Sequence, residues 1–562
     1  MEANIIVHTN TTTMVDRISQ LPESVVHHIL SFLNSPRDLV RISVLSREWF
    51  AITASLPYLE FNIHHFELYE RNVFFNYVAY TISRFRNQNF CLHTFKITID
   101  EFRDPKEVDA IDECLGLMLK KCMQVLVIND VSHRMSRYRL PDVILSISSL
   151  TSLTIKHCDL PSSLMVDGVK FKSLKLLKLV GVRIDEKIIN YLANCCTLLE
   201  KLYLIFCDGF TKFCVYGHQN LRDVRIAYHK EVERIDIEAP NLSYLFLNKM
   251  CQTRDPCMNL AKCKKLTTLT FVTFTYLDTE VLSEFLIRFP FIENLILYIP
   301  RDCNKLTFSS DTLRTLALCS RCEFENIMID APNLLFFMYS HHPNYPSSHL
   351  VRNSAESKTQ KVMECYPDDD IGSLWFQQLR EFLDKNNGFK VLKLHISASF
   401  VDVAELKRIQ TPPYELEHIV LELDTIKELS VYTAVVDAVL WCFCPRSLSL
   451  TSKFSFINFA ERNHVVKFTY DKLLQQEQGQ TNIQIVLSST SKEEKHMSNL
   501  TSLLKALPSD QLTQTITFFK LKRYTIFLSA MISIYMCITY KISSLVMYLY
   551  SRSEGSEPVK GM

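Results

Sequence analysis

The sequence has little glycine and lacks the glycine patterns that bind phosphates. Only 10 of its 562 residues are glycine. No two of them stand at the spacing of a dinucleotide-binding loop, and no Gly-Lys-Ser/Thr occurs. The patterns Gly-x-Ser-x-Gly and His-Glu-x-x-His are also absent. These absences exclude the enzyme classes that are identified by such local motifs.

An excess of charge of either sign is also missing. The chain has 62 basic and 61 acidic residues and a net charge of +1, so it has no overall field that attracts nucleic acid or an acidic membrane. Its hydrophobic fraction of 47% and charged fraction of 22% are ordinary for a packed chain and exclude a mainly disordered one. We expect no nucleic-acid partner.

The 18 cysteines are scattered, and the N-terminal stretch is too polar for a secretory signal. We therefore expect reduced, buried thiols in the cytoplasm or the nucleus. Cys319 and Cys322 form one C-x-x-C pair, but no second pair stands at zinc spacing. The sequence predicts no metal site and no cofactor.

Residues 16–57 predict three short helices. Apolar side chains recur at steps of three to four, as one face of the first helix requires: Leu21, Val25, Ile29, Leu30 and Leu33. Asn34-Ser35-Pro36 ends this helix and begins the second, and Ser46 begins a third that carries Trp49. So small a unit buries little surface alone. Its many large apolar residues indicate a helical partner, or docking on the rest of the chain.

The run "LPESVVHHILSFLNSPRDLVRISVLSREW" resembles the F-box, in particular that of the plant F-box/leucine-rich-repeat family. This resemblance implies binding to the Skp-type adaptor, and through it to the cullin, of a ubiquitin ligase. Glu48 and Thr53 depart from the family, which often has a basic residue and a second Trp there. The alternative is a helical cap on the following array. The expected adaptor-facing and internal contacts are Leu21, Pro22, Ile29, Leu30, Leu33, Leu45 and Trp49.

After residue 61 the pattern becomes a recurring L-x-x-L-x-L. Its middle anchors are Leu153, Leu177, Leu202, Val224, Leu245, Leu269, Leu295, Leu316 and Phe337, at intervals of 21 to 26 residues. This period is typical of leucine-rich repeats. Weaker copies occur at 92–97, 122–127, 389–394 and 416–421. The predicted fold class is therefore an α/β repeat: a three-helix F-box followed by a curved leucine-rich-repeat solenoid.

Successive side chains of a strand point to opposite faces, so within each copy every second residue is expected to be buried and the residues between them to point outward. The outward row includes Tyr203, Arg225, Phe246, Ile296 and Met338. Large apolar groups that face solvent in a row favour an interaction surface. We expect Tyr203, Arg225, Phe246 and Ile296 to bind a protein substrate. Two alternatives stay open, namely that the register slips or that a loop covers the row.

The expected domains are an F-box (14–57), leucine-rich repeats (85–340), a polar insertion (341–372), and further repeats with the family's C-terminal region (373–519). Residues 524–550 form a hydrophobic tail interrupted by Lys541. Its length approaches that of a membrane span. A membrane anchor and an apolar cap on the array are both open.

The resemblance implies a non-catalytic substrate-recognition subunit of a Skp-cullin-F-box ubiquitin ligase. The F-box would bind the adaptor, and the repeats would hold a protein for ubiquitination. The alternative is a leucine-rich-repeat scaffold without a ligase role. An enzyme is disfavoured, because no motif places a base beside a nucleophile.

Overall fold

The computed structural model describes residues 18–521 with gaps, in two compact units that comprise residues 1–275 and 276–562. The gaps are 19–20, 34–35, 67–69, 87–91, 101, 121–122, 132–136, 162–170, 252–255, 274–289, 299–304, 321, 342–359, 368–369, 387, 398–399, 402–405, 407–411, 424–425, 427, 453–458, 477–481, 490–493, 498 and 508–513. The hydrophobic tail at 524–550 lies outside the described residues. Within the described part, no helix is both long and apolar enough to cross a membrane.

The first unit begins with the three expected helices, α1 (Glu23–Leu30), α2 (Pro36–Ser43) and α3 (Arg47–Ala54). The Ser46 hydroxyl caps α3 by accepting a hydrogen bond from the Trp49 backbone N–H at 3.1 Å. Val26, Leu30 and Leu56 form the buried centre of this region. The expectation of three short helices is therefore confirmed.

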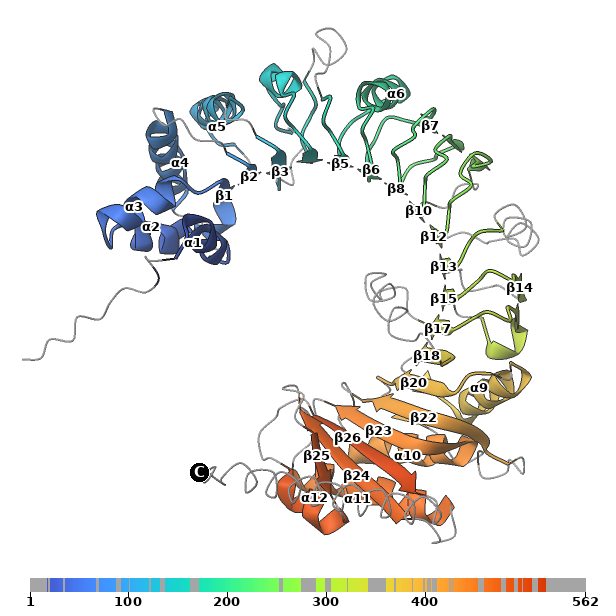
Figure 1. Cartoon of the computed structure of the whole chain (residues 1–562). Coiled ribbons are helices and arrows are strands. Elements are labelled where there is room, and N and C mark those ends of the chain that lie inside the picture. The colour runs from blue at the N-terminus through green and yellow to red at the C-terminus, as the bar shows by residue number, and fades with distance from the viewer. Residues whose placement is uncertain are drawn as a thin grey trace, which may run out of the picture. The chain divides into compact units, whose positions relative to one another are not determined.

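A parallel sheet follows, with strands side by side in chain order (Figure 1). Its strands are β1 (Tyr58–Asn62), β2 (Thr94–Ile99), β3 (Val125–Asp130), β4 (Ser152–Lys156), β5 (Leu176–Val180), β6 (Lys201–Ile205), β8 (Asp223–Tyr228), β10 (Tyr244–Lys249) and β12 (Thr268–Thr273). The predicted anchors from Leu153 to Leu269 pair in register on successive strands and are buried. The predicted register is therefore correct in this unit.

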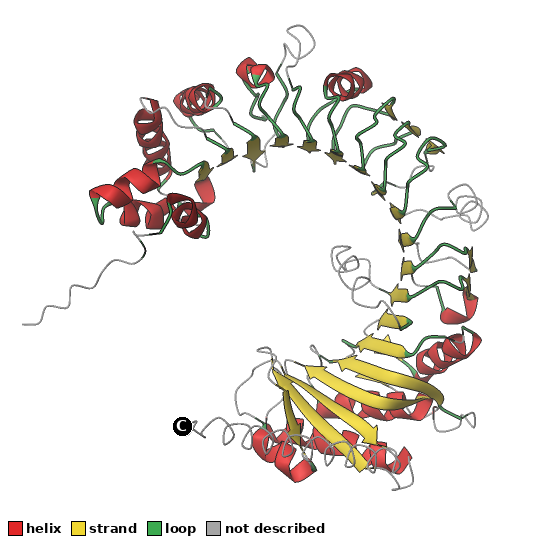
Figure 2. Cartoon of the chain, viewed as in Figure 1, coloured by secondary structure: helices red, strands yellow, loops and turns green. Residues whose placement is uncertain are grey.

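Helices cover only one face of this sheet in the described residues (Figure 2). They are α4 (Arg71–Arg86), α5 (Pro105–Met118) and α6 (Glu186–Cys195). Local residues fix where α6 begins, because the Asp185 carboxylate accepts a hydrogen bond from the Ile188 backbone N–H at 2.8 Å. The opposite, concave face presents the outward side chains of each strand.

Asparagines tie successive repeats together. The amide nitrogens of Asn220 and Asn241 donate to the backbone oxygens of Thr197 and Gln219, at 3.1 and 2.7 Å. Asn333 makes the same contact in the second unit. Such bonds satisfy carbonyls of the preceding turn that no strand pairs. Asn241 and Asn333 are the asparagines of the two "APNL" runs, so this bond gives that position of the runs a structural role.

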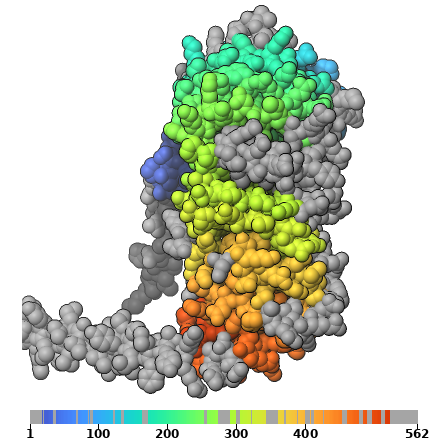
Figure 3. Space-filling view, turned by 90° about the vertical axis from the view of Figure 1, so that its right-hand side faces the viewer, coloured from blue at the N-terminus to red at the C-terminus, as the bar shows by residue number. Residues whose placement is uncertain are grey.

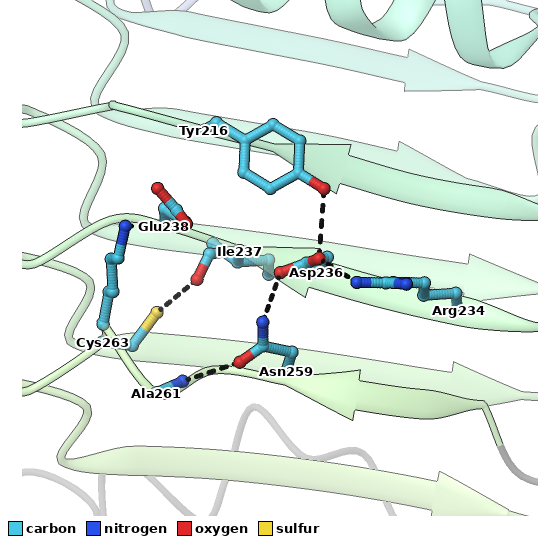
Figure 4. A network of polar contacts seen from close by, with 9 residues as sticks. Tyr216, Arg234, Asp236, Ile237, Glu238, Asn259, Ala261 and Cys263 are labelled. Atoms are coloured by element: carbon cyan, nitrogen blue, oxygen red, sulfur yellow. Dashed lines mark hydrogen bonds and ion pairs between the residues drawn. The ribbon is translucent and has the colours of Figure 1, made fainter.

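A second, smaller sheet lies on the outer side of the first unit, and the sequence did not predict it. It consists of β7 (Lys212–Val215), β9 (Arg234–Ile237) and β11 (Cys257–Asn259). Asp236 is only 3% exposed and accepts hydrogen bonds from side chains of all three strands or their ends (Figure 4). The donors are Tyr216 Oη at 3.0 Å, the Arg234 guanidinium at 2.7 Å and Asn259 Nδ2 at 2.9 Å.

Replacing Asp236 by Ala should lower the free energy of unfolding by about 2–3 kcal/mol, because three donors lose a charged acceptor. Urea unfolding would measure the loss. Glu231→Ala is the control, since Glu231 is an exposed acidic residue of the same unit, and its change should stay within about 0.5 kcal/mol. Equal effects of the two substitutions would show that the network around Asp236 contributes no stability.

In the second unit, parallel strands again follow one another in chain order: β13 (Asn294–Tyr298), β15 (Thr315–Cys319), β17 (Phe336–Ser340), β18 (Val362–Tyr366), β20 (Val391–His395), β22 (Tyr414–Glu422) and β23 (Phe443–Ser452). Figure 3 shows part of this unit as successive bands of yellow-green and orange. The helices are α9 (Ser373–Lys385), α10 (Leu429–Cys442), α11 (Phe459–Gln476) and α12 (Leu500–Ala506). Short outer pairs are β14 (Leu306–Ser309) with β16 (Ile327–Asp330), and β19 (Asp370–Ile371) with β21 (Phe400–Val401).

The sheet changes direction after β23. Strand β26 (Gln514–Leu521) pairs antiparallel with β23, β24 (Asn482–Ser489) pairs with β26, and β25 (Glu494–Met497) pairs with β24. A parallel repeat array would otherwise end in unpaired backbone groups, which template association. These antiparallel strands cover the last edge of the parallel run.

One expectation for the second unit is wrong in part, while residues 342–359 of the same predicted segment lie outside the described residues. The polar insertion predicted at 341–372 contains strand β18, whose five residues are all buried. Met363 stands in register with Phe337 and Leu392, and so occupies the anchor position of a further repeat. The L-x-x-L-x-L pattern does not detect this repeat, because its strand Val-Met-Glu-Cys-Tyr contains no leucine.

Candidate protein-interaction surfaces

The three N-terminal helices expose large apolar side chains. Leu45 is 68% exposed, Ile29 44% and Leu21 38%. We call the following residues the exposed apolar set: Leu21, Val25, Ile29, Phe32, Val44, Leu45 and Phe50. A region with a packed centre and this much exposed apolar surface is typical of a binding site.

The expected adaptor contacts divide into outward and inward residues. Leu21, Pro22, Ile29 and Leu45 are exposed. Leu33 and Trp49 are half-buried and pack against the cluster of Val26, Leu30 and Leu56. Leu30 is only 3% exposed. It therefore serves as an internal contact of the helices, because its side chain fills their shared centre.

The two departures from the F-box pattern have different surroundings. Glu48 is exposed on the first turn of α3. Thr53 is half-buried, and its hydroxyl donates to the Trp49 backbone oxygen at 2.9 Å. Thr53 is thus satisfied within its own helix, whereas Glu48 is exposed to solvent.

On the concave face of the first unit, Tyr203, Asp223, Arg225 and Tyr244 form a cluster. The Arg225 guanidinium lies 4.7 Å from the ring centre of Tyr203 and 4.8 Å from that of Tyr244. It donates to both Asp223 carboxylate oxygens, at 3.1 and 3.0 Å, and Tyr203 Oη donates to the same carboxylate at 2.5 Å. These contacts hold Arg225 in one orientation across three strands.

Lys178 lies in the same outward row, one strand before Tyr203. Burial lowers the pKa of its amine, and the positive charges of Lys156 and Arg225 lower that pKa further. Like charges at close range repel, so an anion bound here would relieve the repulsion. Phe246, the next outward residue after Arg225, is half-buried.

Ile296 is not available on the surface of the second unit. Its side chain is 3% exposed and belongs to a buried cluster with Ala317, Met338 and Phe336. The expectation that Ile296 and Met338 face solvent is wrong. The register is as predicted, since Ile296 pairs with Ala317 and Ala317 with Met338. A slip of register is therefore excluded, and Ile296 is buried in an apolar cluster that extends to Val362 and Tyr366.

The second unit carries a partly buried ionic cluster that the sequence did not predict. His395 Nε2 lies 2.8 Å from Glu364 Oε1, and His395 Nδ1 lies 2.8 Å from Glu422 Oε2. Tyr366 stacks on the imidazole at 4.1 Å and donates to Glu364 at 2.6 Å. Because both ring nitrogens face carboxylates, the ring carries both protons. We call these four residues the His395 cluster.

The pKa values follow from these contacts. Burial lowers the pKa of His395, but hydrogen bonds to Glu364 and Glu422 outweigh it and raise the pKa to about 9. Burial raises the pKa of Glu364, and the hydrogen bonds from His395 and Tyr366 bring it below its ordinary value. The hydrogen bond from His395 also lowers the pKa of Glu422. His395, Glu364 and Glu422 are thus charged near neutral pH.

Comparison with known proteins decides the family. A family model described as "FBD-associated F-box protein At5g56370, LRR repeats" matches residues 111–281, and an F-box-like model matches residues 18–62. The F-box protein At5g03100 of Arabidopsis thaliana is 30% identical over 237 residues, which are 42% of this chain and 70% of that protein. The chain belongs to the plant F-box/leucine-rich-repeat family.

Other members of this F-box/leucine-rich-repeat family match at similar levels. The F-box/FBD/LRR-repeat protein At1g78750 of Arabidopsis thaliana is 29% identical over 42% of this chain and 53% of its own length. The F-box/LRR-repeat protein 13 of the same plant is 28% identical over 59% of this chain and 74% of its own length. Against At1g78750 and the FBD-associated F-box protein At4g13985, the chain spans about half of the relative's length.

The two family models fall on the two surfaces of the first unit. The F-box-like match contains α1, α2 and α3, and thus the exposed apolar set. The leucine-rich-repeat match runs from α5 to beyond β12, and thus contains Tyr203, Arg225, Tyr244 and Phe246. This F-box/leucine-rich-repeat protein therefore carries one candidate surface in each matched region.

Proposed function

We propose that this chain is the substrate-recognition subunit of a Skp-cullin-F-box ubiquitin ligase. The observation that carries the proposal is the exposed apolar set on the F-box-like helices. Standard protein interfaces bury about 1,600 Å² in total, and a few apolar anchors dominate their energy. A Skp-type adaptor that covers Leu21, Ile29 and Leu45 would remove this surface from water.

In this proposal the chain itself is not an enzyme. The helices hold the adaptor, and through it the cullin, while the repeats hold a protein substrate. Ubiquitin transfer then follows from proximity, because a bound substrate lysine meets the ubiquitin thioester at a high effective concentration. The complex would act in the cytoplasm or the nucleus, where adaptor and cullin are present. A membrane anchor at 524–550 stays a separate, untested proposal.

One observation favours a second function. Glu48 places a carboxylate where many family members have a basic residue, and it is exposed on α3. If this charge opposes the adaptor, the chain is a leucine-rich-repeat scaffold that binds a protein without a ligase. The two functions differ in a single testable partner, the adaptor.

Affinity purification of the full chain from plant cells tests the proposal. We expect the Skp-type adaptor and a cullin with the full chain, and neither with a chain that lacks residues 16–57. A protein that binds the repeats should be captured by both forms. Capture of such a protein without adaptor or cullin by the full chain would contradict the ligase function and support the scaffold.

A further inference from the structure

The concave face of strands β4 to β8 has a strong excess of positive charge. Its outward positions carry four basic side chains and one acidic side chain: Lys156, Lys178, Lys201, Arg225 and Asp223. The whole chain is nearly neutral, with a net charge of +1. The excess is therefore a local property of this face, which we call the basic concave surface.

The acid on this surface is already engaged. Asp223 accepts two hydrogen bonds from Arg225 and one from Tyr203. Among the described residues, no carboxylate lies within ion-pair distance of Lys156, Lys178 or Lys201. Lysines elsewhere in this unit do have such partners, as Lys262 with Glu238 at 2.8 Å shows. Three cations thus remain to be matched by a ligand.

Aromatic and apolar groups adjoin these cations. Tyr203 and Tyr244 lie on either side of the Arg225 guanidinium, and Phe246 follows Arg225 in the same row. Aromatic residues and Arg concentrate binding energy in protein interfaces. A surface that combines them with unmatched lysines fits a polypeptide that presents both acidic and apolar side chains.

We propose that the basic concave surface binds an acidic segment of the substrate protein, whose carboxylates pair with Lys156 and Lys178 while an apolar side chain contacts Phe246. This inference rests on the proposed function, because it names the substrate class that the repeats hold. It adds Lys156 and Lys178 to the residues predicted from the sequence, and it omits Ile296.

The spacing of the cations favours carboxylates over phosphate. Lys178 stands opposite Thr154 and Tyr203, whereas Lys156 stands opposite Val180 and Lys201 opposite Leu176. Because neighbouring parallel strands lie about 4.8 Å apart, the three lysines follow a diagonal across β4, β5 and β6 and do not converge on one point. The fork of Arg225, the group best suited to a single phosphate, already holds Asp223. Separate charges along this diagonal match singly charged groups that are spread along an extended chain.

Fluorescence anisotropy on the full chain tests this inference. The probe is a short fluorescein-labelled peptide that alternates Glu with Ser and Leu, and the reference is the same peptide with Gln in place of Glu. We expect the Glu peptide to bind at least roughly tenfold more tightly than the Gln peptide. Added salt should weaken its binding, because screening acts on exposed charges.

Charge reversal locates the site. Lys156→Glu with Lys178→Glu should weaken binding of the Glu peptide at least roughly tenfold. Lys212→Glu with Lys264→Glu makes the same change in net charge at exposed positions off the concave face and should leave binding unchanged. If the variants at the half-buried Lys156 and Lys178 fail to fold, Lys201→Glu gives a second test, because Lys201 is exposed. This substitution should also weaken binding of the Glu peptide.

Three outcomes would overturn the inference. The first is equal binding of the Glu and Gln peptides, and the second is an equal loss in the concave and control variants. The third is tighter binding of a phosphoserine peptide or an oligonucleotide than of the Glu peptide. Adaptor co-purification is scored on the same samples. If the adaptor binds and the Glu peptide does not, only this inference fails, whereas loss of the adaptor contradicts the proposed function.

Discussion

Leu45→Glu should weaken adaptor binding by about 100-fold or more. The Leu45 side chain is 68% exposed, so the substitution removes an apolar contact without opening the helices. In the complex, the new carboxylate would be buried without a partner, which costs several kcal/mol, and each 1.4 kcal/mol is about tenfold in affinity. Co-expression with a Skp-type adaptor, followed by titration calorimetry, measures the change.

Leu198→Glu is the matched control for Leu45→Glu. Leu198 is also exposed, at 45%, but lies outside the F-box-like helices. Its substitution should leave adaptor binding unchanged. If Leu45→Glu binds the adaptor with wild-type affinity and its thermal unfolding midpoint is unchanged, the exposed apolar set is not the adaptor site.

Leu30→Ala separates folding of the helices from direct contact. Leu30 is buried in their centre, and truncating a buried Leu typically costs about 2–5 kcal/mol. We expect this variant to lose helical signal and adaptor binding together. Leu45→Glu should instead lose binding alone. The contrast shows which expected adaptor residues act at the interface and which act within the helices.

The sequence predicted most of the repeat array because its physical signal is local. Alternation of buried and outward residues inside each strand, repeated at 21 to 26 residues, fixes both the strands and their register. Strand β18 was missed because its anchor is Met363 and its neighbour Cys365, which do not match a leucine pattern. Apolar burial, rather than leucine itself, is what the fold requires.

A sequence pattern cannot show which of the predicted adaptor and substrate residues are exposed in the folded chain. The alternation of side chains along a strand shows which face of the sheet a residue occupies, but it does not show whether other side chains cover that face. Ile296 and Tyr203 share the same outward position, yet Ile296 lies among large apolar neighbours whereas Tyr203 is half-buried beside Arg225. The difference arises on adjacent strands, whose contacts a single repeat does not reveal.

The His395 cluster could not be seen before the register was known. Glu364, His395 and Glu422 are separated by 31 and 27 residues along the chain. They meet only because β18, β20 and β22 are neighbouring parallel strands. Because the sequence analysis did not predict strand β18, it also did not place the Glu364 carboxylate beside His395. Once that strand is placed, the cluster follows from the alignment of the strands.

Replacing His395 by Gln should lower the free energy of unfolding by about 3–5 kcal/mol, because it leaves the buried Glu364 carboxylate without its cation. Urea unfolding at pH 6.5 measures the loss. Lys390→Gln is the control, since Lys390 is an exposed lysine that directly precedes the same strand, and its replacement should cost under about 1 kcal/mol. Glu364→Gln combined with His395→Gln should recover part of the stability, because no charge then remains unpaired at that position.

The same cluster should make stability depend on pH in the alkaline range. The pKa of His395 is about 9 in the folded chain and about 6.5 when unfolded. Its contribution is therefore complete below about pH 6.5 and is lost as the pH rises toward 9, at about 1.4 kcal/mol per pH unit. Urea midpoints measured from pH 6 to pH 9, taken at intervals of about one unit, should fall in the wild type and stay nearly level in His395→Gln. Parallel falls in both proteins would show that another group titrates, and the cationic state of His395 would lose its support.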